Sequence, residues 1–379
     1  MKIVHFVPWL VKGGGERAAV DLANWQIGQG HDVTIVSGIK VDERLLRNDI
    51  DERANVIFVV ERPSRGMLYL RGLAWLWRNR QWLRACDVLH AHMSFPAFLL
   101  TVFYFYRLLM REWKPLIVET YHAVGVYIPG FDRACHAWMA RRRDALVLMA
   151  EDPFWRAFAQ RHDHQIIRFI PNGLEPPRCR RRQDPEPIAY ARQHQIPSGC
   201  ELIGTIGRFV PERRPELYVP LFARIARRHG QTVHFVMIGS GPQLEEVREL
   251  ARRAHVADRI SFPGLALDPS IPLALCDIYV TIGVGAVVGL AAVHAALCGI
   301  PVVAIQLVHG YTATSTDWVW SHANPDKVAE RILELLAHPE RRVKLASAQQ
   351  LYARENLTVG KMGAAYERVY EQARHALLK

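Results

Sequence analysis

The sequence has few of the features that mark secreted or membrane-spanning proteins. Its six cysteines form no Cys-x-x-Cys pair in 379 residues, which favours reduced thiols over a disulfide framework. No apolar run reaches the roughly 20 residues that span a bilayer, since the nearest candidate, 97–110, is short and contains Arg107. The N-terminus lacks the apolar core of a signal peptide. We therefore expect a cytoplasmic protein, either soluble or peripheral on a membrane.

Acidic residues are also fewer than basic ones. The chain has 48 Lys and Arg against 37 Asp and Glu, which gives a net charge of +11. Such an excess favours an anionic partner, for example a phosphorylated ligand, an acidic membrane face or a nucleic acid. No helix-turn-helix, zinc spacing or aromatic platform accompanies the charge, so nucleic acid is not expected as a partner.

Short apolar runs alternate with helix-length amphipathic segments in both halves of the chain. The runs expected to be strands are 2–7, 31–36, 56–60, 87–90, 115–121 and 144–149, then 201–207, 233–238, 260–262, 278–281 and 301–305. This alternation predicts parallel β-α-β winding, hence two doubly wound α/β domains.

The domain boundaries follow from a segment rich in proline and arginine. Residues 175–200 show no periodicity and are expected to be a linker. The expected organisation is therefore a first domain at 1–174, a second at 201–355, and a final helix at 356–379 that packs back on the first domain.

Three features of the first half could contact a ligand. Gly14 and Gly15 belong to a glycine turn, followed by Glu16, that opens a helix after the first strand. Glycines let the backbone approach a ligand closely, and a helix start favours phosphate. The turn does not have the Gly-x-Gly-x-x-Gly spacing of dinucleotide-binding enzymes. His92 and His122 follow two other strands, at the sheet edge where ligands bind.

Metal binding is not expected. His90 and His92 are one residue apart, but no third ligand is evident nearby in the sequence, and two ligands rarely hold a metal.

The second half contains a basic strand-end motif. Gly207 ends a strand, Arg208 follows, and Arg213 comes one loop later. Two converging cations suit a diphosphate, because guanidinium groups bind phosphate oxygens in pairs. Gly239 and Gly241 form a second glycine turn after the strand 233–238.

Together these motifs resemble those of the family 4 retaining glycosyltransferases, which have the two-domain GT-B fold. The similar strings are Gly-Gly-Gly-Glu, His-x-His, Thr-x-His, Pro-Asn-Gly at 171–173, Gly-Arg-x-x-x-Glu-Arg and Gly-x-Gly-Pro. The resemblance implies two Rossmann-like domains that face a cleft. The first would bind the acceptor and the second a nucleotide-sugar donor.

The sequence departs from the family pattern at the donor site. Ala286 and His294 stand where the family has two glutamates, and Arg214 replaces a glycine. His294 could still hydrogen-bond a ribose hydroxyl. Main-chain amides at a helix start do not depend on side chains. The amides expected to face the sugar and diphosphate are those of Val287, Val288, Gly289 and Leu290.

The resemblance also implies roles for the other residues. His122, Arg208 and Arg213 would be catalytic, and Glu16 and His92 would lie on the acceptor side. Donor and phosphate contacts would come from Gly14, Gly15, Gly207, Arg208, Arg213, Gly239, Gly241, Val287, Val288, Gly289, Leu290 and His294.

The implied reaction is transfer of a sugar from a nucleotide-diphosphate sugar, with retention of configuration and without a metal or other cofactor. The acceptor would be a glycan or lipid-linked intermediate of lipopolysaccharide, capsule or exopolysaccharide. Two alternatives remain open. One is a catalytically degenerate GT-B protein that binds a nucleotide or an active partner, and the other is an epimerase-like nucleotide-sugar enzyme.

A segment rich in arginine and tryptophan has two interpretations. Between Arg65 and Arg84 the chain interleaves Trp75, Trp77 and Trp82 with arginines. This mixture suits the interface of an anionic leaflet, here the inner face of the plasma membrane. It equally suits a core-facing helix with an ordinary charged face.

Overall fold

The protein forms two compact α/β units, which confirms the predicted fold class. The computed structural model describes residues 1–11, 13–40, 49–60, 67–110, 112–122, 130–149, 153–162, 165–229, 232–283, 289–306, 319–322 and 324–377. The first unit runs from Met1 to Glu175 and is completed by residues from Val359 onward, and the second comprises Pro176–Thr358.

The first unit is built on a seven-stranded sheet with the order β3-β2-β1-β4-β5-β6-β7, in which all neighbours are parallel. Its strands are β1 (Lys2–Trp9), β2 (Asp32–Ile39), β3 (Asn55–Val60), β4 (Val88–His92), β5 (Leu116–Tyr121), β6 (Ala145–Leu148) and β7 (Ile166–Phe169). The central strands are buried along almost their whole length, because helices cover both faces of the sheet.

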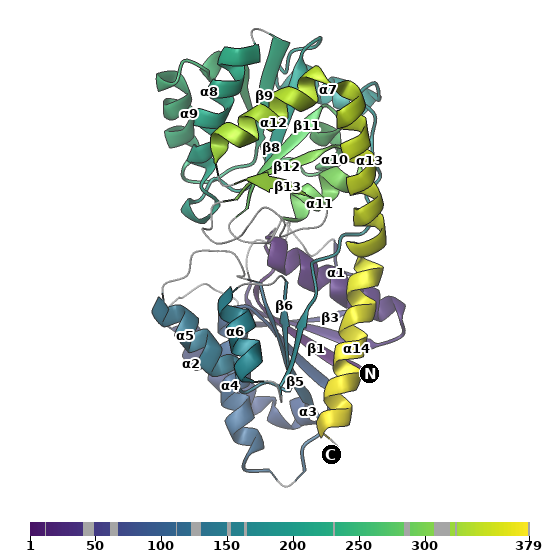
Figure 1. The fold of residues 1–379 in the computed structure, drawn as a ribbon. Helices are drawn as coiled ribbons and strands as arrows, with labels where there is room; N and C mark the ends of the chain where they lie inside the picture. Colours follow the sequence, from purple (N-terminus) through teal and green to yellow (C-terminus); the bar gives the residue numbers. More distant parts are fainter. Residues whose placement is uncertain are drawn as a thin grey trace. The chain divides into compact units, whose positions relative to one another are not determined.

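Helices lie on both faces of this sheet (Figure 1), and each face has its own hydrophobic core. On one face α1 (Gly14–Gly28) packs with α14 (Val359–Leu377), so the last helix of the chain belongs to the first unit. On the other face α2 (Leu68–Arg78), α3 (Arg80–Arg84) and α4 (Ser94–Arg107) cover the sheet. Two further helices are α5 (Gly130–Ala140) and α6 (Pro153–Arg161).

The second unit has a six-stranded parallel sheet with the order β10-β9-β8-β11-β12-β13. Its strands are β8 (Glu201–Ile206), β9 (Val233–Ile238), β10 (Ile260–Gly264), β11 (Ile278–Gly283), β12 (Val302–Gln306) and β13 (Trp320–His322).

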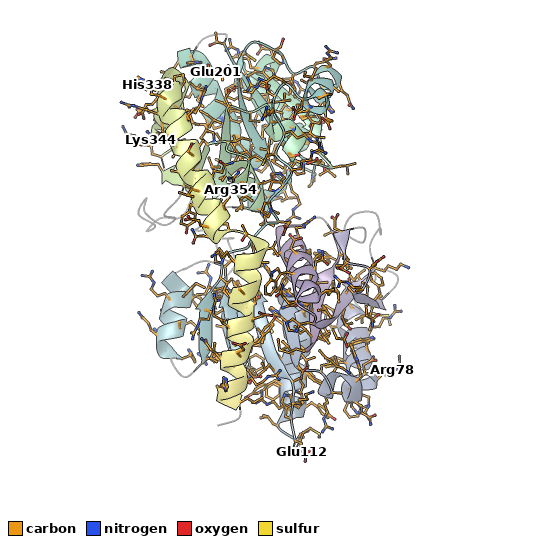
Figure 2. All side chains as sticks on the ribbon, turned by 90° about the vertical axis from the view of Figure 1, so that its right-hand side faces the viewer. Arg78, Glu112, Glu201, His338, Lys344 and Arg354 are labelled. Carbon is orange, nitrogen blue, oxygen red and sulfur yellow. The ribbon has the colours of Figure 1, made fainter. Side chains whose placement is uncertain are left out.

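Helices cover both faces of the second sheet as well (Figure 1). One core is shared with α8 (Tyr218–His229), α9 (Leu244–Arg253) and α12 (Pro325–Ala337), and the opposite face carries α7 (Pro185–Gln193) and α10 (Ser270–Leu273). Helix α11 (Leu290–Leu297) packs against α13 (Pro339–Asn356). Figure 2 labels His338, Lys344 and Arg354 along α13.

The segment expected to be a linker differs from that expectation, because half of it is folded onto the second unit. Asp184 is the N-cap of α7 and Pro185 occupies its first turn, a combination that favours a helix start. Ile196 is in the core beside this helix. Arg182 forms an ion pair of 2.6 Å with Asp277, whose carboxylate also accepts the backbone N–H of Leu202.

None of the described helices is both long and apolar enough to cross a membrane.

Candidate functional site

In the first unit the structure brings the glycine turn and His122 together. Gly13 is the N-cap of α1, and His122 follows the last residue of β5. A Cβ atom at Gly15 would lie 3.1 Å from Cγ of His122 and 2.8 Å from Cε of Met93. A larger residue at position 15 would therefore displace the imidazole, whereas Gly14 is exposed and has open space at its Cβ position.

Met93 adds a strained backbone at the same place. It follows His92 at the end of β4 and has φ 70° and ψ −177°, a region that non-glycine residues rarely adopt. Such a conformation costs about 1–3 kcal/mol and tends to occur at functional sites.

His122 is the end of a chain of buried hydrogen bonds. Its Nε2 lies 2.9 Å from Nδ1 of His92, and Nε2 of His92 lies 2.9 Å from Nδ1 of His5. Nε2 of His5 in turn lies 2.7 Å from Oε1 of Gln26, on α1. Nδ1 of His122 is buried and has no hydrogen-bond partner in the described part of the chain.

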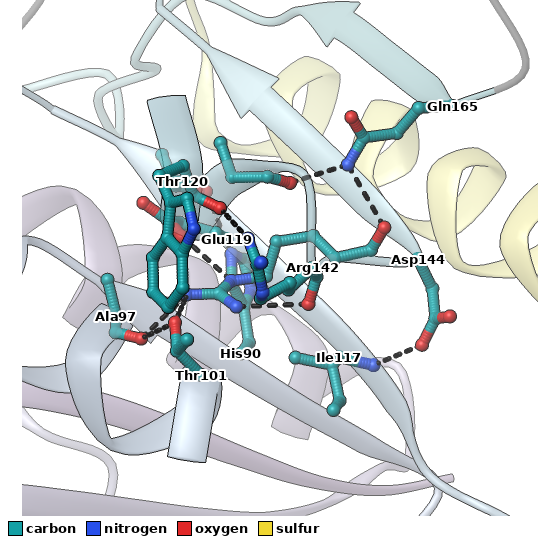
Figure 3. Close-up of polar contacts among 12 residues, drawn as sticks. His90, Ala97, Thr101, Ile117, Glu119, Thr120, Arg142, Asp144 and Gln165 are labelled. Atoms are coloured by element: carbon teal, nitrogen blue, oxygen red, sulfur yellow. Dashed lines mark hydrogen bonds and ion pairs between the residues drawn. The ribbon is translucent and has the colours of Figure 1, made fainter. Parts of the chain in front are cut away.

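A second branch starts from the same glutamine. Nε2 of Gln26 donates to the hydroxyl of Tyr370, which lies 2.8 Å from Nδ1 of His90. Nε2 of His90 lies 2.8 Å from the hydroxyl of Thr120, which also contacts the hydroxyl of Tyr366. Figure 3 shows His90 close to Thr120. Helix α14 thus supplies two buried tyrosines to the hydrogen-bond network around these histidines.

All four histidines are held in the neutral form. Burial lowers the pKa of His5 and of His122 to about 4. Burial, followed by the repulsion of neighbouring imidazoles, keeps the pKa of His90 and His92 well below the usual value. Each imidazole therefore offers one N–H donor and one acceptor nitrogen at neutral pH.

The structure adds a third histidine, His5, to the pair His90 and His92, and the sequence did not reveal it. Nitrogens of His5, His90 and His92 lie within 4.8 Å of one another, which is close enough for a metal ion. All six ring nitrogens, however, already take part in the hydrogen bonds given above. An ion could bind there only by displacing these bonds.

Glu16 and His92 are both buried, although the sequence suggested an acceptor-facing position. Oε1 of Glu16 accepts a hydrogen bond of 2.7 Å from the indole of Trp9. Oε2 lies so near the helix start that a Cβ at Gly13 would be 2.1 Å from it. A carboxylate in this place interacts favourably with the helix dipole. An acceptor role for either residue stays a prediction.

A buried ion pair holds β5 in place behind His122. Nε of Arg143 donates to Glu119 at 2.8 Å, and the two side chains are 0% and 1% exposed. The guanidinium also donates to the carbonyl of Ala97 and the hydroxyl of Thr101, and Figure 3 labels both of these acceptor residues. These bonds tie β5 to α4.

In the second unit the two predicted glycine turns touch each other. Gly207 donates to Ile238 and Phe209 donates to Ser240, both at 2.9 Å. A Cβ at Gly239 would be 1.8 Å from the carbonyl oxygen of Gly207. The glycines after β9 thus allow close packing against the loop that carries Arg208.

Arg208 is exposed beyond the end of β8. Its guanidinium has no hydrogen bond or ion pair with any of the residues that the structure describes. Arg213, also exposed, ends a short 3₁₀ helix in the same loop. The next residue, Arg214, has φ 50° and ψ 48°, a left-handed conformation that explains why a glycine suits this position.

The helix that the sequence analysis predicted to contact the donor is α11. Gly289 is its N-cap and Leu290 its first residue, with no side-chain cap. The N–H groups of Leu290 and Ala291 therefore have no acceptor within the helix, whereas that of Ala292 donates to the carbonyl of Gly289 at 2.8 Å. His294 is buried within the helix. Ala286, Val287 and Val288 lie outside the described residues, so the predictions for them are not tested.

The residues that the sequence interpretation missed are His5, Gln26, Tyr366 and Tyr370. Each is a polar or amphipathic residue in the interior of a strand or helix that is otherwise apolar on its buried face. This was the only local signal, because their partners are remote in sequence.

Comparisons with known proteins agree with this architecture. The model of "Glycosyltransferase Family 4" matches residues 12–178, and the model of "Glycosyl transferases group 1" matches residues 188–351. A GDP-mannose-dependent alpha-(1-6)-phosphatidylinositol monomannoside mannosyltransferase of Mycobacterium tuberculosis is 28% identical over 198 residues, which is 48% of this chain and 50% of that protein. A 2-deoxystreptamine N-acetyl-D-glucosaminyltransferase of Streptomyces fradiae is 29% identical over 37% of this chain and 34% of that protein. The matches thus span about half or less of these relatives.

Solved structures share the fold over nearly the whole chain. HepE of Anabaena, in complex with UDP and glucose, has a TM-score of 0.77 at 16% identity and covers 98% of this chain and 100% of its own. WaaG, a glycosyltransferase involved in lipopolysaccharide biosynthesis, has a TM-score of 0.70 at 15% identity, with 97% and 99% covered. With both halves matched by family models and a fold shared with solved glycosyltransferases, the chain belongs to the family 4 glycosyltransferases and has the GT-B fold.

Proposed function

We propose that the protein transfers a sugar from a nucleotide-diphosphate sugar to a glycan or lipid-linked acceptor, with retention of anomeric configuration. The observation that carries this proposal is the exposed guanidinium of Arg208, which has no partner among the described residues and lies on a glycine-supported loop beyond β8. An exposed cation at the carboxyl end of a parallel sheet suits an anionic ligand. A diphosphate is the anionic part that all nucleotide-diphosphate donors share.

The chemistry of the leaving group explains why cations matter here. As the bond between sugar and phosphate breaks, negative charge develops on the diphosphate, and preorganised donors stabilise it. Arg208 and Arg213 would supply that charge, and the N–H groups at the start of α11 would add to it.

We further propose that transfer needs no metal or other cofactor. Guanidinium groups can supply the charge that a metal would otherwise provide. The histidine cluster is not suited to hold an ion, since its ring nitrogens bond to one another, to Gln26, to Thr120 and to Tyr370.

The donor is testable directly. Purified protein would be incubated with UDP-, GDP-, ADP- and CMP-linked sugars, and release of the free nucleotide would be measured with and without EDTA. We expect release from one class of nucleotide-diphosphate sugar, unaffected by EDTA, and loss of release in Arg208→Ala. Binding without release would favour the catalytically degenerate alternative.

A surface of the first unit supports a membrane-associated acceptor. Four aromatic side chains from α2, α4 and α5, here named the aromatic patch, form two pairs. The ring centroids of Trp77 and Tyr106 are 6.1 Å apart, and those of Phe105 and Trp138 are 6.2 Å apart. Arg80 stacks over Trp77 at 4.2 Å and Arg142 over Trp138 at 3.7 Å. Stacked aromatic and guanidinium groups suit the interface of an anionic bilayer.

Exposed apolar and basic side chains also surround the aromatic patch. Leu108 and Leu109, at the end of α4, are exposed, and so is Leu70 on α2. Arg78 lies at the outer edge of the first unit (Figure 2). Trp75 and Trp82, in contrast, pack against the core. The core-facing interpretation of this segment thus fits Trp75 and Trp82, and the membrane-facing one fits the exposed Trp77.

We propose that this surface binds an anionic lipid bilayer on the cytoplasmic side, where a lipid-linked acceptor would be presented. The mycobacterial relative, by its name, also acts on a phosphatidylinositol lipid. Flotation with vesicles of phosphatidylglycerol and phosphatidylcholine would test the proposal. Leu109→Ser should lose binding, whereas Leu267→Ser, a leucine in the second unit that is equally exposed at 79%, should retain it. Equal binding to purely zwitterionic vesicles would contradict an electrostatic contribution.

A further inference from the structure

Four polar side chains of the first unit form a linear series of hydrogen bonds, here named the histidine chain. It links Gln26 on α1, His5 on β1, His92 on β4 and His122 after β5 through contacts of 2.7, 2.9 and 2.9 Å. The imidazoles of His5 and His92 and the amide of Gln26 are buried, and His122 at the end of the chain is half-buried. No charged side chain forms part of this series of bonds.

We infer that Gln26 is a positioning residue, which fixes through His5 and His92 the ring nitrogen of His122 that carries the proton. A neutral imidazole has one donor and one acceptor nitrogen. The carbonyl oxygen of Gln26 only accepts, so Nε2 of His5 must donate to it, and Nδ1 of His5 must accept from Nε2 of His92.

The same requirement passes along the chain. Since Nε2 of His92 donates, its Nδ1 accepts, and it accepts from Nε2 of His122. Nδ1 of His122 is then left without a proton. It is an acceptor and, within the described residues, the buried end of the chain with no partner of its own.

The opposite direction is less favourable. If the amide of Gln26 were turned round, its N–H group would donate to His5, every proton would shift, and His122 would present an unpaired N–H. Buried N–H groups without a partner are rarer than buried acceptors without one. The amide orientation in the structure avoids an unpaired N–H group at His122.

The anchoring of Gln26 supports this role. Its N–H group donates a hydrogen bond to the hydroxyl of Tyr370 at 3.3 Å, and that hydroxyl can in turn donate a hydrogen bond to Nδ1 of His90 at 2.8 Å. The amide is thus held from both ends, and α14 closes the series of bonds. An exposed glutamine would have no such preference for one orientation.

The consequence concerns what His122 can bind. A bare nitrogen accepts a hydrogen bond from a hydroxyl group, but it cannot accept one from a phosphate oxygen that carries no proton. With the proposed function as its basis, the inference assigns to His122 a hydroxyl group of a sugar as its partner. The absence of a side chain at Gly15 leaves the space that the ring occupies.

The test is nitrogen-15 NMR of histidine-labelled protein without ligand, because ring-nitrogen shifts and couplings report which nitrogen is protonated. The signals of His122 would be assigned by their loss in His122→Gln. We expect a proton on Nε2 and none on Nδ1 in the wild type. Gln26→Met should produce a mixture of the two tautomers at His122, three side chains away.

The conservative variant Gln26→Glu should restore the wild-type tautomer, because a carboxyl group presents an accepting oxygen to His5 whether or not it is ionised. His234 of the second unit, which is hydrogen-bonded to Ser261, should keep its shifts in every variant and so reports that the second unit is unaffected.

A proton on Nδ1 of His122 in the wild type, or an unchanged tautomer in Gln26→Met, would overturn the inference. These results do not depend on turnover. If the protein proves active, Gln26→Met should lower kcat/KM about tenfold and Gln26→Glu should recover most of it. If no nucleotide sugar is a substrate, the proposed function fails while the NMR result still decides the role of Gln26.

Discussion

Gly241 lies directly against the backbone of Phe209. A Cβ atom at Gly241 would be 2.4 Å from the carbonyl oxygen and 2.9 Å from the amide nitrogen of Phe209, and φ at Gly241 is 153°. The loop after β9 therefore supports the loop after β8 by direct contact, and it can do so only with a glycine. The position of Arg208, one residue before Phe209, depends on this contact.

Gly241→Ala should destabilise the second unit by about 2 kcal/mol or more, because the added methyl group meets backbone atoms that cannot move aside. Gly207→Ala is the matched control. A Cβ there would have no atom within 4 Å, so we expect a change below about 0.5 kcal/mol. Urea unfolding of both variants would measure the difference, and equal stabilities would show that the loops can separate.

Replacing Arg214 should reveal the cost of its left-handed backbone. Arg214→Gly and Arg214→Ala both remove the ion pair with Glu216, but only glycine relieves the conformation. We expect the glycine variant to be more stable than the alanine variant by about 1 kcal/mol. Thermal unfolding would give the comparison, and an alanine variant that matches or exceeds the glycine variant would contradict it.

The buried pair of Glu119 and Arg143 should be sensitive to loss of one partner. Arg143→Met leaves a carboxylate unpaired in the core, and we expect a loss of about 3–5 kcal/mol. Lys327→Met, which breaks the exposed pair with Glu330, should cost less than about 1 kcal/mol. Denaturant titration would compare the two, and similar small losses would show that water reaches Glu119.

Stability should fall on mild acidification. The pKa of His5 and of His122 is about 4 in the folded protein because of burial, against about 6.5 in an unfolded chain. Between these values the unfolded state binds protons that the folded state does not. The stabilising contribution is therefore complete above pH 6.5 and is lost as the pH falls toward 4.

For one such histidine the loss amounts to about 3 kcal/mol, at about 1.4 kcal/mol for each unit of pKa difference. The free energy of unfolding should be measured at several pH values between 7 and 4. His122→Gln should show a shallower decline than the wild type. A decline of the same steepness in both proteins would place the acid-sensitive groups elsewhere.

The sequence predicted most strands because buried parallel strands are continuous apolar runs, as in β1 and β9. It missed β7 and β13. β7 has four residues and is exposed at one end, and β13 has three residues, so neither gives a clear apolar signal. It also missed α7, because a single helix between prolines and arginines has little hydrophobic periodicity.

The site was predictable only in part. Glycine turns and strand-end residues are local patterns, so Gly15, His122 and Arg208 could be singled out. The hydrogen-bond network around the buried histidines could not be predicted, because its bonds join residues far apart in the chain. The amide of Gln26 and the hydroxyl of Tyr370 are 344 positions apart, and no local pattern links them.

The measurement that tests the account most directly is nucleotide binding by isothermal titration calorimetry. UDP, GDP, ADP and CMP would be titrated into the wild type, into Arg208→Ala and into Arg78→Ala, an exposed arginine on α2 of the first unit. We expect one nucleoside diphosphate to bind the wild type and Arg78→Ala alike, and Arg208→Ala to bind it at least tenfold more weakly, since a charge-assisted hydrogen bond contributes about 1.5–3 kcal/mol. Equal affinity of all three proteins for that nucleotide would contradict the assignment of Arg208 to the diphosphate.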